Sequence, residues 1–88
     1  MTPRRVRVTD TARDHFGLEC TWWLKNRDQQ ALFAAQLERA IEIIATLPGA
    51  GTPYPHADTP GLRRFFVRKL NCHLYYTFDD EEVIVRAL

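Results

Sequence analysis

The spacing of apolar and polar side chains predicts a short strand followed by a helix. Val6 and Val8 alternate with arginines, which is the period-two pattern of a strand that buries one face. From residue 10 to residue 26 the apolar positions recur every three or four residues, as on one face of an amphipathic helix. Thr9 precedes this segment and is placed to cap it. Gly17 interrupts the helix, and we expect it to mark close packing against a neighbouring element.

A second apolar stripe predicts another helix. This helix begins after Asp28, which is expected to cap it, and ends at Pro48-Gly49. The connection between the two helices is short and polar, so we expect an antiparallel helix hairpin. The stripe consists of Phe33, Leu37, Ala40, Ile41, Ile44 and Leu47.

The rest of the chain predicts a loop and three strands. Residues 48–61 contain every proline except Pro3 and every glycine except Gly17, as in an irregular loop. Strand patterns resume at Leu62 and are divided by turns at Leu70-Asn71 and Asp79-Asp80. The order β-α-α-β-β-β predicts a single α+β domain over residues 1–88, with the helix hairpin packed on one face of a small, mainly antiparallel sheet.

The composition narrows the class of protein. No apolar run approaches the ~18 residues that a membrane-spanning helix needs, and no apolar segment follows the N-terminal charges as in a secretory signal. Cys20 and Cys72 are too few for a disulfide scaffold, so we expect reduced thiols and a cytoplasmic location. Cys72 with His73 falls short of the four ligands of a zinc site, so no metal is expected, and no cofactor motif is present.

The basic residues gather in two clusters, although the formal net charge is only +1. A run of four acidic residues, 79–82, follows both clusters in the sequence and is expected to form a turn. A net charge of +1 gives no strong general attraction for nucleic acid, but a local basic face remains possible. The first cluster consists of Arg4, Arg5 and Arg7, and the second of Arg63, Arg64, Arg68 and Lys69.

A series of short motifs, in a fixed order, carries a family resemblance. They are Val6-Arg7-Val8-Thr9 with Ala12, Leu47-Pro48, Gly51, Pro60-Gly61-Leu62-Arg63-Arg64, His73-Leu74-Tyr75-Tyr76 and Val83-Ile84-Val85. With this order and spacing, the chain resembles the RelE/ParE superfamily of toxins from type II toxin–antitoxin pairs, and it looks closest to the ParE branch. Members usually continue past the last strand into a tail with aromatic or basic residues, whereas this chain stops at Leu88.

The resemblance to ParE implies a toxin that inhibits DNA gyrase by binding. It also implies a cognate antitoxin that forms a hetero-oligomer with the toxin. The C-terminal segment of this antitoxin is expected to be disordered when alone. The second basic cluster, Arg63 to Lys69, is expected to contact gyrase or its cleaved DNA. The low net charge favours this interpretation over one that requires docking on ribosomal RNA.

The resemblance leaves two alternatives. One is a RelE-like ribosome-dependent mRNA endonuclease, in which Arg63 matches an arginine of the RelE enzymes and His73 or Tyr75 would transfer protons. The other is a non-toxic module that only binds the antitoxin, because the C-terminal tail is short.

The antitoxin is expected to cover the helix hairpin. Trp22 and Trp23 are neighbours on one helix and cannot both face the core, so one is expected to be exposed as an interface anchor. With Phe33 and Leu37, these tryptophans form the predicted antitoxin-binding set. Tyr75 and Tyr76 lie on opposite faces of a strand, so one of them is expected in the core.

Overall fold

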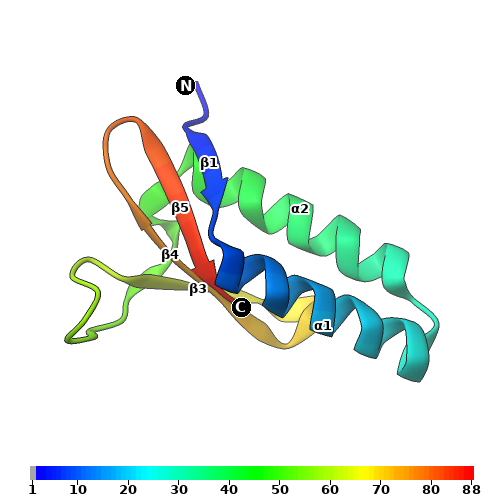
Figure 1. The fold of residues 1–88 in the computed structure, drawn as a ribbon. Helices are drawn as coiled ribbons and strands as arrows, with labels where there is room; N and C mark the ends of the chain where they lie inside the picture. Colours follow the sequence, from blue (N-terminus) through cyan, green and yellow to red (C-terminus); the bar gives the residue numbers. More distant parts are fainter. Residues whose placement is uncertain (1) are drawn as a thin grey trace.

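Two helices cover one face of a five-stranded sheet in the computed structural model, which describes residues 2–88 (Figure 1). The strands lie in the order β1-β5-β4-β3-β2, and β1 is parallel to β5 while all other neighbours are antiparallel. This arrangement confirms the predicted α+β class and the helix hairpin. The elements are β1 (Arg5–Val8), α1 (Asp10–Arg27), α2 (Gln30–Thr46), η1 (Pro48–Ala50), β2 (Thr52–Pro53), β3 (Arg63–Val67), η2 (Arg68–Leu70), β4 (Cys72–Phe78) and β5 (Glu82–Ala87).

The first helix begins where the sequence predicts. The Thr9 side chain accepts a hydrogen bond from the backbone N–H of Ala12 at 3.1 Å, so Thr9 caps α1. The second predicted cap is wrong. Asp28 adopts a left-handed conformation with φ 50° and ends α1 by donating its N–H to Leu24, and Gln29 precedes α2 without a side-chain cap. A two-residue connection needs a left-handed residue to reverse the chain, and aspartate tolerates that conformation.

The prediction for Gly17 is also wrong. A Cβ placed at Gly17 would meet nothing within 4 Å, so no neighbour approaches this residue closely. The loop over residues 48–61 is more regular at its start than predicted. It contains the 3-10 turn η1 and the two-residue strand β2, which pairs with Arg63 and Arg64 and adds a fifth strand to the sheet.

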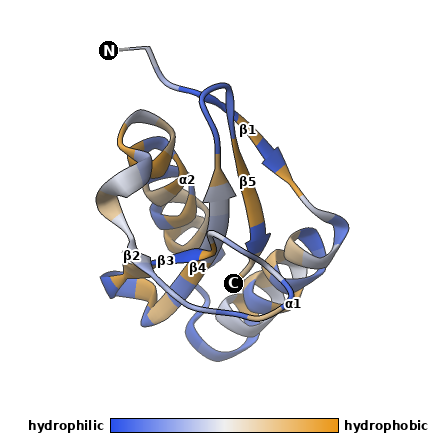
Figure 2. Cartoon of the chain, turned by 90° about the vertical axis from the view of Figure 1, so that its left-hand side faces the viewer, coloured by the Kyte–Doolittle hydropathy of each residue, from blue (hydrophilic) through white to orange (hydrophobic). Residues whose placement is uncertain are grey.

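The core lies between the helices and the sheet. The largest fully buried side chains come from one helix and two strands, and are Tyr76, Ile44, Leu74, Val83 and Val85. The alternation of polar and apolar residues on β1 is visible as blue and orange segments in Figure 2, and the turn between β4 and β5 is hydrophilic throughout. Tyr76 is buried and Tyr75 is half-buried, as the alternation along β4 predicts.

The sheet therefore has two distinct faces. The helix-covered face carries Arg63, Phe65 and Val67 of β3, together with Leu74 and Tyr76 of β4. The opposite face, called the outer face below, carries the alternate residues of the central strands. They are Arg64 and Phe66 of β3, His73, Tyr75 and Thr77 of β4, and Glu82, Ile84 and Arg86 of β5. No helix within residues 2–88 is long and apolar enough to cross a membrane.

Candidate functional site

A hydrogen-bonded clamp holds the segment Pro48–Gly51 against the sheet. The buried Tyr76 hydroxyl donates to the carbonyl of Pro48 at 2.6 Å and accepts the N–H of Gly51 at 2.9 Å. Arg63 Nη2 donates to the carbonyl of Gly51 at 2.6 Å and to that of Gly49 at 3.3 Å. Arg63 and Tyr76 are partners across β3 and β4, so two neighbouring side chains fix one segment. Below, this network is called the clamp.

Gly51 is required in the clamp by space. Its φ of −78° is open to any residue, but a Cβ there would lie 2.5 Å from the Tyr76 hydroxyl and 2.6 Å from the carbonyl oxygen of Arg64. The backbone carbonyl cannot move aside as a flexible side chain can. The approach of Tyr76 to the backbone therefore depends on glycine at this position.

The clamp gives Arg63 a structural task. Its guanidinium bonds two carbonyls on the helix-covered side, and its Nε is buried with no hydrogen-bond partner among residues 2–88. His73 and Tyr75 lie on the outer face. The structure thus places the three candidate catalytic residues on two faces of the sheet and does not bring Arg63 to the other two.

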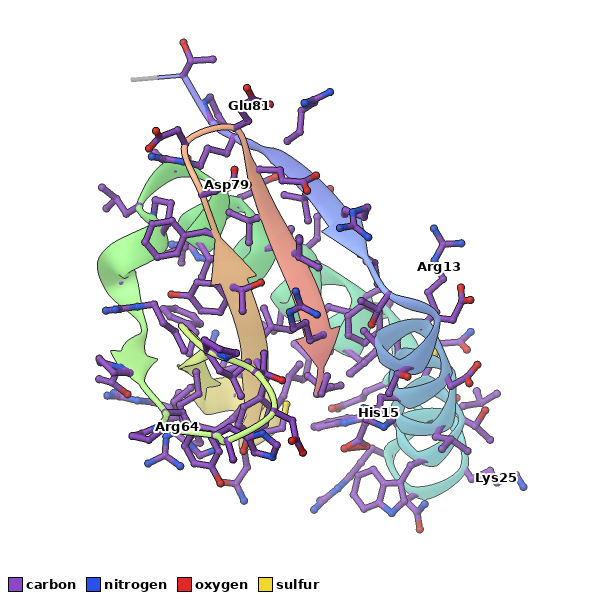
Figure 3. The ribbon with its side chains drawn as sticks, turned by 60° about the vertical axis from the view of Figure 1, so that its left-hand side comes forward. Arg13, His15, Lys25, Arg64, Asp79 and Glu81 are labelled. Carbon is purple, nitrogen blue, oxygen red and sulfur yellow. The ribbon has the colours of Figure 1, made fainter. Side chains whose placement is uncertain are left out.

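Arg64 is the arginine that joins His73 and Tyr75 on the outer face. It is the cross-strand partner of Tyr75, and Phe66 is the partner of His73. The rings of Phe66 and His73 have centroids 5.0 Å apart, and those of His73 and Tyr75 are 6.2 Å apart. Figure 3 shows Arg64 beside the loop that connects β2 to β3, remote from the outward-pointing Lys25 of α1. The outer face therefore combines a cation with a row of aromatic rings.

Tyr54 from that loop extends the row. Its ring makes an edge contact with Tyr75 at a centroid distance of 5.4 Å, and the Arg64 guanidinium carbon lies 5.0 Å from the Tyr54 centroid. Such cation–π contacts hold an arginine in place while leaving its N–H groups free to bind. Sequence reasoning did not single out Tyr54, because the signal for its role is a contact between distant segments.

Arg68 and Lys69 both line a cavity of about 220 Å³ beside α2, and each also lines another cavity. Arg68 lines the cavity that Arg64 and His73 also line, at the beginning of β2. Lys69 lines a separate cavity of about 420 Å³ with Trp22, Trp23 and Arg27. The predicted target-binding set is therefore spread over several places. Arg63 lies in the clamp, Arg64 shares a cavity with Arg68, and Lys69 lies between the cavity of the tryptophans and the one it shares with Arg68.

Arg86 is a residue of the outer face that the sequence reasoning missed. Its Nε donates to the Thr77 hydroxyl at 2.9 Å, which sets the side chain along the sheet surface. The available signal was the alternation on β5, where Val83 and Val85 are buried and Ile84 and Arg86 are not.

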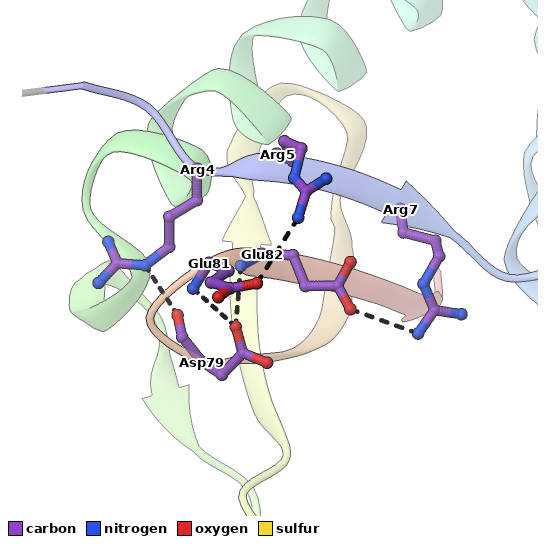
Figure 4. Close-up of polar contacts among 6 residues, drawn as sticks. All are labelled: Arg4, Arg5, Arg7, Asp79, Glu81 and Glu82. Atoms are coloured by element: carbon purple, nitrogen blue, oxygen red, sulfur yellow. Dashed lines mark hydrogen bonds and ion pairs between the residues drawn. The ribbon is translucent and has the colours of Figure 1, made fainter.

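The N-terminal basic cluster is engaged by the acidic turn between β4 and β5 (Figure 4). Arg4 Nε donates to the carbonyl of Asp79 at 2.8 Å, and Arg5 and Arg7 form ion pairs with Glu81 and Glu82 at 3.7 and 3.5 Å. These are the only ion pairs within residues 2–88. The cluster is thus paired at the surface with the acidic turn, through one hydrogen bond and two exposed ion pairs. The cations without a carboxylate partner in that range include Arg64, Arg68, Lys69 and Arg86.

Asp79 organises this turn. Its Oδ1 accepts the N–H groups of Glu82 and Glu81 at 2.9 and 2.8 Å. These bonds, with a smaller contribution from the charges of Arg4 and Arg5, hold the pKa of the Asp79 carboxyl below its usual value.

The predicted antitoxin-binding residues of the helix hairpin differ in their exposure to solvent. Trp22 is 45% exposed and meets Trp23 edge-on at 5.6 Å, which agrees with the expectation that one tryptophan faces solvent. Phe33 and Leu37 are only 3% and 9% exposed, so they offer little surface of their own. They form the floor of a groove between α1 and α2, of about 630 Å³.

The surface of this groove is apolar with an acidic edge. Phe16, Cys20 and Ile41 are partly buried along its walls, and Glu38 and Glu42 lie at its rim. Gly17 also borders the groove, which accounts for the open space beside it.

Cys72 is half-buried in a setting that disfavours its thiolate form. Burial, and to a lesser extent the charge of Glu19, raises the pKa of its thiol to about 11. Among residues 2–88, no three His, Cys, Asp or Glu side chains gather as a metal site would require.

The fold, with a helix hairpin on one face of the sheet and a cationic aromatic surface on the other, is that of the RelE/ParE toxin class. The model of the ParE toxin of the type II toxin–antitoxin system parDE matches residues 6–88. The chain therefore belongs to the ParE toxin family, which confirms the resemblance drawn from its motifs.

Two solved structures are similar in fold. The chromosomal ParDE toxin–antitoxin system from P. aeruginosa aligns with a TM-score of 0.77 at 9% identity, over 96% of this chain and 91% of that one. The toxin–antitoxin complex RelBE2 from Mycobacterium tuberculosis aligns with a TM-score of 0.61 at 23% identity, over 96% and 93% of the two chains. No curated protein sequence matches the chain.

Proposed function

We propose that this ParE-family toxin inhibits DNA gyrase by binding through the outer face of its sheet. The observation that carries the proposal is the match of residues 6–88 to the ParE toxin family. The outer face supports it with an arginine that has no carboxylate partner within residues 2–88 and is held beside a row of aromatic rings. Arg63, the arginine that the RelE resemblance matched, lies on the opposite face from His73 and Tyr75. The target implies that the protein acts in the cytoplasm.

Arg64 is the residue on which the proposed gyrase contact depends most. It is unpaired by any carboxylate within residues 2–88 and is held over Tyr54. A charge-assisted hydrogen bond contributes ~1.5–3 kcal/mol, so Arg64→Gln is expected to weaken inhibition on the order of tenfold or more. Arg13→Gln is the matched control, because Arg13 is an exposed arginine of α1 that points away from the sheet (Figure 3).

The experiment is a supercoiling and cleavage-complex assay with purified gyrase. Inhibition by the wild type and by Arg13→Gln, with loss in Arg64→Gln, is the expected result. The same samples are incubated with ribosomes engaged on mRNA. Absence of any effect on gyrase at micromolar toxin, together with mRNA cleavage on the ribosome, would replace this proposal by the RelE-like one.

We further propose that a cognate antitoxin neutralises the toxin by covering the helix hairpin. The apolar groove between α1 and α2 fits the apolar face of a helix, and the rim residues Glu38 and Glu42 favour a helix with basic flanks. The exposed Trp22 offers a second anchor beyond the end of the groove. An antitoxin segment that is disordered alone would fold on this surface as it binds.

The antitoxin proposal is tested with the product of the adjacent small open reading frame. Ile41→Asp places a charge inside the groove and is expected to abolish binding. Glu42→Gln removes one charge from the rim and is expected to weaken binding far less. Calorimetry measures affinity, and circular dichroism confirms that both variants fold. If Ile41→Asp binds as tightly as the wild type, the groove is not the docking site.

Expression without the antitoxin separates a toxin from a non-toxic module. Arrest of growth by the wild type, and its relief in Arg64→Gln at equal protein level, is expected. Normal growth with folded wild-type protein would favour the module that binds only the antitoxin.

A further inference from the structure

A cavity of about 370 Å³ lies where β2 begins beside β3. Arg64, Arg68 and His73 line it, together with Thr52 and Phe66, and no carboxylate does. Its volume is within the range of small-molecule sites, roughly 300–1,000 Å³. Three basic side chains from β3, η2 and β4 thus surround one space, and the charge there is uncompensated by the chain itself.

The cavity is preorganised on two sides. Tyr54 holds Arg64 through the cation–π contact at 5.0 Å, and the loop that carries Tyr54 is fixed by its N–H, which donates to Leu62 at 2.9 Å. The opposite wall is the segment Ala50–Thr52, which includes Gly51 of the clamp. A site whose cations are positioned before binding loses less conformational entropy when the ligand arrives.

The chemistry of the lining matches a phosphate group. Arginine presents several N–H donors in a planar fork that suits phosphate oxygens, and two arginines with a histidine supply enough donors for a phosphate. The ring of Phe66, which is 46% exposed, forms an apolar side of the same cavity and contacts His73. An exposed aromatic ring beside a cationic site is the arrangement on which nucleic-acid bases stack.

We propose that this cavity binds a phosphate group of a nucleotide or nucleic-acid strand, through Arg64, Arg68 and His73, with a base stacked on Phe66. The inference deepens the proposed function and rests on it in one respect: in a complex with gyrase, the phosphate would belong to the bound DNA. Binding of the phosphate itself is a property of the free toxin and is tested without gyrase.

The test is a titration of the isotope-labelled full chain, followed by amide and histidine NMR signals. The probes are inorganic phosphate, a 5′-phosphorylated deoxydinucleotide and the same dinucleotide without its 5′-phosphate. Phosphate is expected to shift the signals of residues 50–52, Arg64, Arg68 and His73. The double variant Arg64→Gln/Arg68→Gln is expected to weaken phosphate binding at least tenfold, while Arg13→Gln binds like the wild type.

The probes distinguish the sources of the phosphate. Tighter binding of the phosphorylated dinucleotide than of inorganic phosphate, with shifts at Phe66, supports a strand or nucleotide. Equal affinities support the phosphate site and remove the base-stacking part. Wild-type phosphate affinity in the double variant overturns the proposal, provided its circular dichroism spectrum is native. If the double variant loses phosphate binding but still inhibits gyrase fully, only the link between the phosphate site and the gyrase complex is overturned.

Discussion

Tyr76 and Arg63 are cross-strand partners that grip the same four-residue segment, Pro48–Gly51, from adjacent positions on the sheet. The segment follows the C-terminal end of α2 and precedes β2. It also contributes to the wall of the cavity that Arg64 lines. The clamp therefore links the helix hairpin to the outer face. We expect substitutions of its residues to lower the stability of the fold, and to change target binding only as a consequence.

Removing the Tyr76 hydroxyl is expected to destabilise the protein. In Tyr76→Phe the Gly51 N–H and the Pro48 carbonyl lose their buried partner, and each unsatisfied group costs ~1–3 kcal/mol. We expect a loss of about 2 kcal/mol, measured by urea unfolding. Tyr75→Phe is the control, since no hydrogen bond of the Tyr75 hydroxyl is present within residues 2–88. Equal stability of the two variants would contradict the clamp.

Alanine is expected to have opposite effects at two glycines. Gly51→Ala brings a Cβ to 2.5 Å from the Tyr76 hydroxyl and 2.6 Å from a backbone oxygen, so the melting temperature should fall. Gly17→Ala meets no atom within 4 Å and replaces a glycine inside α1. It should stabilise the protein by about 0.5–1 kcal/mol. Calorimetry on both variants checks the contrast, and a stabilised Gly51→Ala would be incompatible with the described geometry.

Alkaline pH is expected to weaken the fold through Cys72. Its thiol pKa is raised to about 11 in the folded chain, so the unfolded chain releases this proton first. Stability from this group is complete below the unfolded value near pH 9 and is lost as the pH rises toward 11. Urea unfolding at pH 8 and pH 10.5 measures the change. The Cys72→Ala variant should show a smaller decrease, whereas an unchanged decrease would assign it to other groups.

Acid is expected to weaken the turn between β4 and β5 through Asp79. The lowered pKa of its carboxyl means that the stabilisation is present above the unfolded value, near pH 3.8, and is lost as the pH falls through the folded value. Asp79→Asn keeps a side-chain oxygen but removes the charge. An NMR titration of the Glu81 and Glu82 amides reports the transition in the wild type. If the chemical shifts of those amides do not change as Asp79 ionises, the hydrogen bonds to Oδ1 are not the source of the acid effect.

Local features of the chain were predictable because few neighbouring residues decide them. Thr9 caps α1 as expected, since a cap involves a side chain and a backbone group three residues away. Asp28 shows the limit of the same reasoning. Aspartate is a residue type that often caps the start of a helix. Here the tight reversal between α1 and α2 places Asp28 in a left-handed conformation, so it ends the first helix.

The candidate site was only partly predictable. Alternation along a strand shows that Arg63 and Arg64 occupy opposite faces, but it does not show which face the helices cover. The clamp decides it, because Arg63 reaches carbonyls at Gly49 and Gly51 that follow α2. Likewise, the sequence shows the first basic cluster, which includes Arg5 and Arg7, but not its partners. The parallel pairing of β1 with β5 brings these two arginines to Glu81 and Glu82.

The sequence by itself determined the order of the elements, the α+β class and the family, because hydrophobic periodicity, caps and short motifs are recorded along the chain. The tertiary structure alone decided which of the basic residues remain available to a target. In the second cluster, Arg63 is enclosed by the clamp, Arg64 and Arg68 share a cavity, and Lys69 lies with the tryptophans. The reason is physical: the availability of a charge depends on the groups that distant segments bring within hydrogen-bonding distance, and the spacing of residues along the chain does not specify that distance.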